Sequence, residues 1–266
     1  MKQIHTFVVL AYKESGLLEK CIKSVLNQSI NTNVIIATST PNNYITALAK
    51  KYNLKVSVNK GKSGIGADFD FAIKTANTEL ITIAHQDDIY DYLYAENIVN
   101  MYQKNINKKP IIVFSDYYEI RNEKKILSNK NLVIKRILLF PLRITSLSKY
   151  RFFKRWALRF GDAISCPAVT FVKKNIQFPI FESNLKCDVD WNAWEKLSKI
   201  NGSFIFISKK LMGHRIHNES TTTNILKDNI RTKEDYEILC RFWPKSIAKL
   251  VTGIYKNSEK SNKVKK

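Results

Sequence analysis

Short apolar runs alternate with amphipathic segments along roughly the first ninety residues of the chain. Leu18, Ile22 and Val25 recur at helical spacing, which predicts a helix over residues 15–29 with Ser15 as its N-cap. The predicted strands are residues 5–11, 33–38, 54–58 and 79–84, and the predicted helices between them are residues 15–29, 44–52 and 67–76. This alternation is typical of an α/β fold, with a mostly parallel sheet that carries helices on both faces.

The second half of the chain has a less regular pattern. Large apolar residues are interleaved with Lys and Arg over residues 118–162, which we interpret as a basic amphipathic helical insertion. A helix is predicted from Asp188, followed by two short strands over residues 203–208 and 209–216. We therefore expect one domain over residues 1–220, and a C-terminal extension of one or two basic helices over residues 221–266.

Ligands of open α/β sheets bind beyond the carboxyl ends of the strands. The loops that follow three of the predicted strands contain the segments LAYKE, ATSTPN and AHQDD. These loops should line one crevice.

Adjacent carboxylates follow the predicted strand at residues 79–84. Asp87 and Asp88 stand where a strand should end at the crevice, and carboxylates there suit a hard divalent cation that keeps positions open for phosphate oxygens. The alternative is structural, because Asp88 could serve as the N-cap of a helix that follows it.

Two acids open the predicted helix at Asp188. Trp191, Trp194 and Leu197 share one face of it, which indicates packing in the core. One of Asp188 and Asp190 can cap the helix, while the other projects from its start. A carboxylate near a helix N-terminus stays ionised, as a general base for a hydroxyl must be.

A third polar segment surrounds Ile216. In an extended chain Arg215 and His217 point to the same side, where a cation and an imidazole could meet a diphosphate or its metal. A solvent-facing strand end explains the same pattern.

In this order, these segments resemble glycosyltransferase family 2 over roughly residues 5–220. LAYKESGLLEKCIKSVLNQS is similar to the opening strand, loop and helix of that family, and HQDD takes the place of its Asp-x-Asp metal motif. DVDWNAWEKL is similar to the Glu-Asp-Trp-x-x-Trp helix of the family. HRIHNESTT is similar to its Arg-x-His segment, which closes over the donor diphosphate.

The resemblance implies a Rossmann-like GT-A fold and an inverting reaction in bacterial cell-surface polysaccharide synthesis. It places Asp190 on the catalytic aspartate, Asp87 on the cation and Tyr12 against the nucleotide base. Contacts to the nucleotide sugar are expected from Ala11, Tyr12, Glu14, Ser39, Asp68, Gln86, Asp87, Asp88 and Arg215, and metal contacts from Asp87, Asp88 and His217. The expected cofactor is Mn²⁺ or Mg²⁺. The expected partners are a nucleoside-diphosphate sugar, foremost a UDP-sugar, and a saccharide acceptor that is lipid-linked.

Several positions depart from the family pattern. His85 stands in place of the first Asp of the metal motif, and the following Gln86 is also uncharged. Ser39 and Thr40 replace an acidic pair that reads the base, and Val189 replaces the Glu before the catalytic aspartate. Asp68 and Asp70 stand where Arg and Asn are common. The donor base and sugar therefore do not follow from the resemblance.

The chain is strongly basic. Its 266 residues include 44 Lys and Arg against 23 Asp and Glu, a formal net charge of +21, which favours a polyanionic partner. The cations of the insertion are Lys124, Lys125, Lys130, Lys135, Arg136, Arg143, Lys149, Arg151, Lys154, Arg155 and Arg159. Basic amphipathic segments of this kind bind anionic membrane surfaces, although the same helices could pack on the core and present a solvated face.

Other functions suit part of the pattern. Basic charge interleaved with aromatic residues is also typical of nucleic-acid binding, but here the acids gather at strand ends and no nucleic-acid motif is present. A nucleotidyltransferase would also combine a metal with an α/β core. We expect no nucleic-acid partner, and self-association through the C-terminal helices stays open.

The 4 cysteines lie far apart without metal-ligand spacing, which is typical of free thiols in a reducing compartment. No apolar run reaches the length of a membrane-spanning helix, and the opening segment does not match a signal peptide. These features predict a cytoplasmic protein, peripheral on the inner face of the plasma membrane.

Overall fold

The computed structural model describes residues 3–62, 64–181, 184–216 and 230–259 of the chain. The strands are β1 (His5–Ala11), β2 (Asn33–Thr38), β3 (Lys55–Val58), β4 (Leu80–His85), β5 (Ile89–Tyr90), β6 (Pro110–Arg121), β7 (Lys124–Ile126), β8 (Val169–Val172) and β9 (Ser203–Arg215). The α-helices are α1 (Leu18–Leu26), α2 (Asn43–Lys51), α3 (Ile65–Thr75), α4 (Tyr94–Lys104), α5 (Lys130–Leu138), α6 (Arg151–Trp156), α7 (Val189–Ser198), α9 (Ile230–Leu239) and α10 (Lys245–Glu259). Short 3₁₀ helices are η1 (Ile106–Lys108), η2 (Phe140–Arg143), η3 (Cys166–Ala168) and η4 (Lys173–Asn175).

One mixed sheet organises the fold. Its strand order is β3-β2-β1-β4-β8-β6-β9-β5, with β7 paired to β6. Strands β3, β2, β1 and β4 are mutually parallel, as are β6 and β9, while β8 runs antiparallel to both of its neighbours. The predicted mostly parallel α/β sheet is therefore confirmed.

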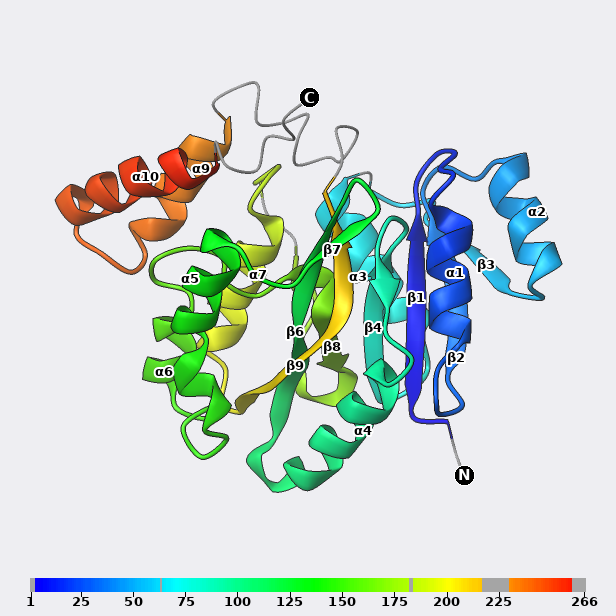
Figure 1. The fold of residues 1–266 in the computed structure, drawn as a ribbon, viewed down its shortest axis with the longest axis horizontal. Coiled ribbons are helices and arrows are strands. Elements are labelled where there is room, and N and C mark those ends of the chain that lie inside the picture. Colours follow the sequence, from blue (N-terminus) through cyan, green and yellow to red (C-terminus); the bar gives the residue numbers. More distant parts are fainter. Residues whose placement is uncertain (1–2, 63, 182–183, 217–229, 260–266) are drawn as a thin grey trace.

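Helices cover both faces of this sheet, as predicted. One buried cluster contains residues of α1, α2 and α4, and the other contains residues of α3, α7 and α9. Trp191 and Trp194 of α7 are fully buried, which confirms that this pair belongs to the core. Figure 1 shows α5, α6, α9 and α10 at one end of the molecule, and α1 and α2 beside β1–β3 at the other.

Two local predictions were wrong, and one alternative interpretation is excluded. Ser15 is not the N-cap of α1, because that helix begins at Leu18 and Ser15 instead forms the turn before it. Asp88 does not cap a helix, because α4 begins only at Tyr94. The two short strands expected after α7 are one strand, β9, because an irregularity in its pairing with β6 absorbs extra residues and lets the ladder continue.

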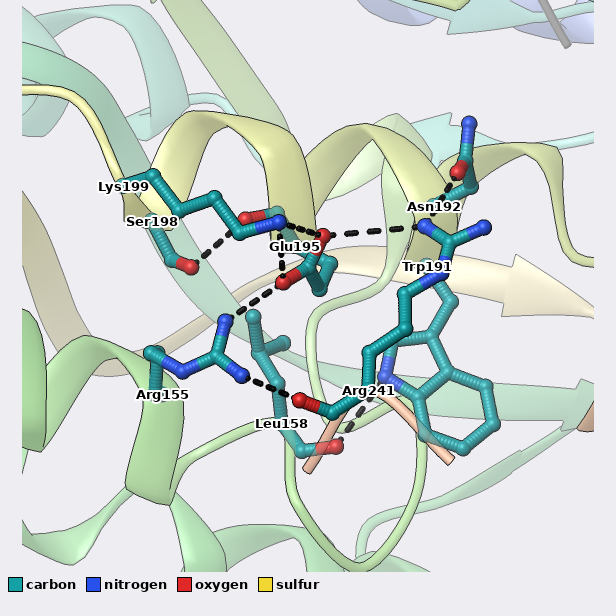
Figure 2. A network of polar contacts seen from close by, with 8 residues as sticks. All are labelled: Arg155, Leu158, Trp191, Asn192, Glu195, Ser198, Lys199 and Arg241. Atoms are coloured by element: carbon teal, nitrogen blue, oxygen red, sulfur yellow. Dashed lines mark hydrogen bonds and ion pairs between the residues drawn. The ribbon is translucent and has the colours of Figure 1, made fainter. Parts of the chain in front are cut away.

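A network of polar contacts joins α7 to the helices at its end of the molecule (Figure 2). Its centre is Glu195, whose side chain is 1% exposed. The Glu195 carboxylate accepts from Arg155 of α6 at 2.5 Å and from Lys199 at 2.8 Å, and Arg241 lies 3.6 Å away. Arg155 also donates to the carbonyl of Arg241. Burial raises the pKa of Glu195, but these cations outweigh it and hold the pKa below its usual range.

No helix among the described residues is long and apolar enough to cross a membrane. The four cysteines are free thiols, as expected, with Cys21 and Cys166 buried.

Helix α3 packs closely against the segment before α7. Asp70 accepts hydrogen bonds from the backbone N–H groups of Ile180 and Phe181, at 2.9 and 3.2 Å. Gly66 lies in the first turn of α3, where a Cβ atom would stand 2.5 Å from the carbonyl oxygen of Phe181. The absence of a side chain at residue 66 therefore permits this contact.

We expect Gly66→Ala to lower the free energy of unfolding by about 1–3 kcal/mol, because the backbone of Phe181 cannot give way cheaply. Gly253→Ala in α10 is the matched control. Its new Cβ would meet nothing within 4 Å, so better helix propensity should stabilise the protein by up to ~1 kcal/mol. Urea unfolding of both variants measures the difference. Equal stabilisation by the two substitutions would contradict the close contact.

Candidate active site

The carboxyl ends of β1, β2 and β4 lie side by side. In the parallel ladders Ala11 pairs with Thr38, and Leu10 with His85, so the loops after these strands start at one edge of the sheet. Two hydrogen bonds join two of those loops. The backbone N–H of Tyr12 donates to the side-chain oxygen of Gln86 at 2.9 Å, and the Gln86 amide donates to the Tyr12 carbonyl at 3.2 Å. The 53% exposed Tyr12 is thereby held beside residues 85–88. We call these residues the metal-like loop, because they take the place of the family's metal motif.

A group that could hold a metal ion stands at the end of β4. Candidate ligand atoms of His85, Asp87 and Asp88 all lie within 4.8 Å of one another. Nε2 of His85 and Oδ2 of Asp88 are buried, and neither has a hydrogen-bond partner within the described part of the chain. Such atoms need a partner, and two carboxylates with one imidazole form a donor set that suits Mn²⁺ or a similar divalent cation. The residues present therefore fit the expected cation.

The fully buried Asp88 also ties this loop to the end of β9. Its Oδ1 accepts from the backbone N–H of Arg215 at 2.9 Å and lies 3.0 Å from Nδ1 of His214. Burial lowers the pKa of His214, but the charge of Asp88 outweighs it and raises the pKa overall. Asp88 thus combines a structural oxygen, which holds β9, with an oxygen that is left for a ligand.

Arg215, at the end of β9, contacts the metal-like loop. Its side chain is 6% exposed, and its Nε donates to the Asp87 carbonyl at 3.1 Å. Its guanidinium also forms an ion pair with Glu123, in the turn between β6 and β7. The structure therefore places Arg215 next to the expected cation residue. His217, which was predicted to accompany it, lies outside the described residues.

A second polar cluster lies at the ends of β2 and β3. Ser39 donates to Asp68 at 2.9 Å, and Asn59 donates to the other oxygen of Asp68 at 2.7 Å. Asp68 belongs to the first turn of α3, so the cluster joins two strand ends to a helix start. Nearby, the Thr40 hydroxyl accepts from the backbone N–H of Lys13. The predicted nucleotide residues Ser39 and Asp68 are thus brought together.

Asp190 stands in the first turn of α7, where it is half-buried. Its Oδ1 accepts from the backbone N–H of Trp191 at 2.9 Å. Burial, and then the charges of Asp190, Asp162 and Asp88, raise the pKa of the Cys166 thiol well above its usual value.

The N-terminus of α7 is held by a residue from far along the chain. Asp188 makes no side-chain capping bond, although it occupies the capping position. Instead the Glu234 carboxylate of α9 accepts from the backbone N–H groups of Lys186, Cys187 and Asp188, at 2.8, 2.8 and 3.1 Å. A carboxylate there satisfies N–H groups that precede the helix and complements its dipole. Glu234 thus fixes the segment that carries Asp190.

Two acids near Asp190 have raised pKa values: Asp188, which precedes α7, and Asp162. Burial, followed by the nearby charge of Asp235, raises the pKa of Asp188 far above its usual value. Burial, followed by the charge of Asp190, also raises the pKa of Asp162. Burial disfavours the ionised form of both carboxyl groups, while Arg231, which lies 4.0 Å from Asp188, lowers the Asp188 pKa.

Most of the predicted residues gather at one edge of the sheet. Ala11 is buried at the end of β1, and Glu14 is exposed in the loop that follows.

The sequence reasoning missed four residues that build the site: Asn59, Glu123, His214 and Glu234. His85 had been noted only as a departure from the metal motif. Its place at a strand end beside two aspartates was a usable signal for a ligand, whereas nothing local in the sequence points to Glu234.

Two kinds of comparison extend these observations. Residues 6–169 match the sequence model of the family described as "Glycosyl transferase family 2". Uncharacterized glycosyltransferases of Rickettsia typhi and Rickettsia prowazekii are each 23% identical over 246 residues, which cover 92% of this chain and 72% of each relative.

Solved structures share the fold. Residues 1–349 of TarS from S. aureus superpose with a TM-score of 0.62 at 12% identity, over 93% of this chain and 69% of that one. The mannosyltransferase PcManGT of Pyrobaculum calidifontis gives 0.60 at 12% identity, over 91% and 64% of the two chains. These likenesses confirm the GT-A fold. The family match covers more than half of the chain and includes the metal-like loop, so this protein belongs to glycosyltransferase family 2.

Proposed function

We propose that the protein is an inverting, metal-dependent glycosyltransferase. It would move a hexosyl or N-acetylhexosaminyl group from a nucleoside-diphosphate sugar to a hydroxyl of a lipid-linked saccharide, in the synthesis of a cell-surface polysaccharide. The observation that carries the proposal is the divalent-cation donor set at the end of β4, in a chain that belongs to glycosyltransferase family 2 and has Asp190 in the first turn of α7.

In this mechanism the donor lies across the sheet edge, with its base against Tyr12 and its diphosphate at Asp87. Asp190 takes the proton from the acceptor hydroxyl, and the hydroxyl oxygen attacks the anomeric carbon from the face opposite the diphosphate. The nucleoside diphosphate leaves in the same step, so one displacement inverts the anomeric configuration. A bound cation would offset the negative charge that develops on the leaving group.

The choice of donor rests on structural relatives. TarS has been solved with UDP-GlcNAc and with UDP, and PcManGT with GDP-Man and Mn²⁺. A UDP-sugar is therefore the first donor to test, with a GDP-sugar second. The two rival activities separate in one coupled assay. A glycosyltransferase releases a nucleoside diphosphate and a nucleotidyltransferase releases pyrophosphate, while a nucleic-acid-binding protein releases neither.

Asp190→Asn tests the general base. We expect kcat to fall by about 10²- to 10⁴-fold with UDP affinity unchanged, because the amide cannot accept the proton. The matched control is Asp188→Asn, two residues away. Asp188 makes no side-chain capping bond, and asparagine keeps the size of its side chain, so this exchange should leave kcat within a few-fold of wild type. Transfer assays and calorimetry with UDP make the measurement. Near-normal transfer by Asp190→Asn would exclude this residue as the base.

Asp87→Asn tests the metal group. We expect affinity for Mn²⁺ alone to fall about 10- to 100-fold, and transfer by the wild type to stop when EDTA removes the metal and to recover on adding Mn²⁺. Glu14→Gln removes the same charge from an exposed side chain at the same sheet edge, and should not change Mn²⁺ affinity. Equal losses in the two variants would point to diffuse electrostatic attraction rather than coordination.

Glu234→Ala tests the support of Asp190. Loss of the acceptor for three backbone N–H groups should lower the free energy of unfolding by about 1–3 kcal/mol. Misplacement of Asp190 should also reduce kcat on the order of 10- to 100-fold without changing the donor KM. Glu237→Ala, an exposed glutamate of the same helix, should alter neither quantity. An unchanged kcat in the folded Glu234→Ala protein would show that α9 does not position the base.

A further inference from the structure

One end of the molecule exposes an unusual set of apolar side chains. We call this surface the lateral face and define it by α5, α6 and α10, which Figure 1 shows at one end, and by η2, which lies between α5 and α6 along the chain. Helix α10 presents Ile247, Leu250 and Ile254 at 40, 67 and 65% exposure. These residues follow i, i+3, i+7 spacing, so they form one stripe, while Ala248 and Thr252 of the same helix are buried.

The other elements of the lateral face also expose large apolar side chains. Ile137 of α5, Phe140 of η2 and Phe152 of α6 are 63, 59 and 61% exposed. Large apolar side chains that are grouped rather than scattered mark a site of interaction with a protein or a membrane. Something apolar should therefore cover this face.

The charge of the insertion has a single sign. Residues 124–161 contain the eleven cations named above and no Asp or Glu. Not all of them face outward, which corrects the expectation of one basic helical surface. Arg136 pairs with Asp116, Lys154 donates to the backbone carbonyls of Ile200 and Gly202, and Arg155 pairs with Glu195.

The exposed cations lie beside the exposed apolar groups. Arg143, Lys149 and Arg151 are exposed in η2, in the turn before α6 and in its first turn. Arg151 also lines a cleft of about 400 Å³ between α6 and the segment that joins α9 to α10, with Phe152, Arg155, Trp156, Arg159 and Phe242. Its walls combine arginines with aromatic rings, and Arg159 stacks over Trp243 at 3.8 Å. Guanidinium groups beside apolar walls suit the phosphate of an amphiphile.

Three kinds of partner could cover the lateral face: a second copy of the chain, a nucleic acid or an anionic bilayer. The combination of cations with aliphatic side chains distinguishes them. A second copy of this face would bring like charges together, which opposes self-association. A nucleic acid would use the cations but gain nothing from an aliphatic stripe of Ile and Leu. An anionic bilayer uses both, because its phosphates attract the cations and its acyl boundary accepts the apolar groups.

We propose that the lateral face docks the protein on an anionic phospholipid membrane. The apolar stripe of α10 and the exposed residues of α5, η2 and α6 enter the acyl boundary, and Arg143, Lys149 and Arg151 pair with lipid phosphates. The Glu195 network connects α6 and the turn before α10 rigidly to α7. This last step rests on the proposed function: docking would hold α7, and with it Asp190, at a fixed place relative to a lipid-linked acceptor.

Cosedimentation with vesicles tests this proposal on the full chain. Wild type should bind vesicles of phosphatidylcholine with phosphatidylglycerol, and bind pure phosphatidylcholine much more weakly. The charge variant combines Arg143→Gln, Lys149→Gln and Arg151→Gln, and should lose on the order of a hundredfold in partitioning, since each cation contributes about fivefold. The apolar variant combines Ile247→Gln, Leu250→Gln and Ile254→Gln, which keep helix propensity, and should lose at least tenfold.

The control variant combines Lys50→Gln, Lys55→Gln and Lys104→Gln, three exposed lysines of α2, β3 and α4. It removes the same charge as the charge variant and should bind vesicles within a few-fold of wild type. All variants should bind UDP like wild type, so this readout tests the donor site separately from the membrane contact.

Three results would overturn the proposal: no binding of wild type to anionic vesicles, full binding by the apolar variant, or equal losses in the charge and control variants. Full binding by the apolar variant, together with tight binding of an RNA oligonucleotide that only the charge variant loses, would instead assign the cations to nucleic acid.

Discussion

The carboxylate of Glu195 meets three cationic side chains, although its own side chain is only 1% exposed. An isolated buried carboxylate is costly, so the partners that neutralise it are not free to move elsewhere. Arg155 arrives from α6 and Arg241 from the turn after α9, and both converge on α7 (Figure 2). This single buried charge therefore ties the middle of the chain and its C-terminal helices to the helix that carries Asp190.

Other carboxylates around the site also connect distant segments, by accepting hydrogen bonds from backbone N–H groups. Glu234 accepts from three consecutive backbone N–H groups before α7, Asp70 from two before the same helix, and Asp88 from the end of β9. In each case an acid from one element satisfies backbone donors of a distant loop. Specific hydrogen bonds therefore add to apolar packing in these segments, and they hold the predicted site residues in place before any ligand arrives.

Hydrophobic periodicity was sufficient to predict the first half of the sheet, because each buried strand there is short, apolar and bounded by polar loops. It failed at β9, where an irregular register carries one strand through Lys209 and Lys210, two residues that look like a break. It failed again for the partners of the site. Glu234 acts on α7 from 46 residues away, and no local pattern records a contact at that separation. The cations of the insertion also divided into inward and outward groups only through tertiary contacts with Asp116 and Glu195.

The reciprocal pair between Gln86 and the backbone of Tyr12 explains a departure from the family pattern. A primary amide carries both a donor and an acceptor, so it can copy the hydrogen bonding of a neighbouring strand. An ionised carboxylate offers acceptors only and would face the Tyr12 carbonyl with like polarity. An uncharged amide at residue 86 therefore lets two neighbouring loops hold one another through a mutual pair of hydrogen bonds, which a carboxylate at the same position could not do.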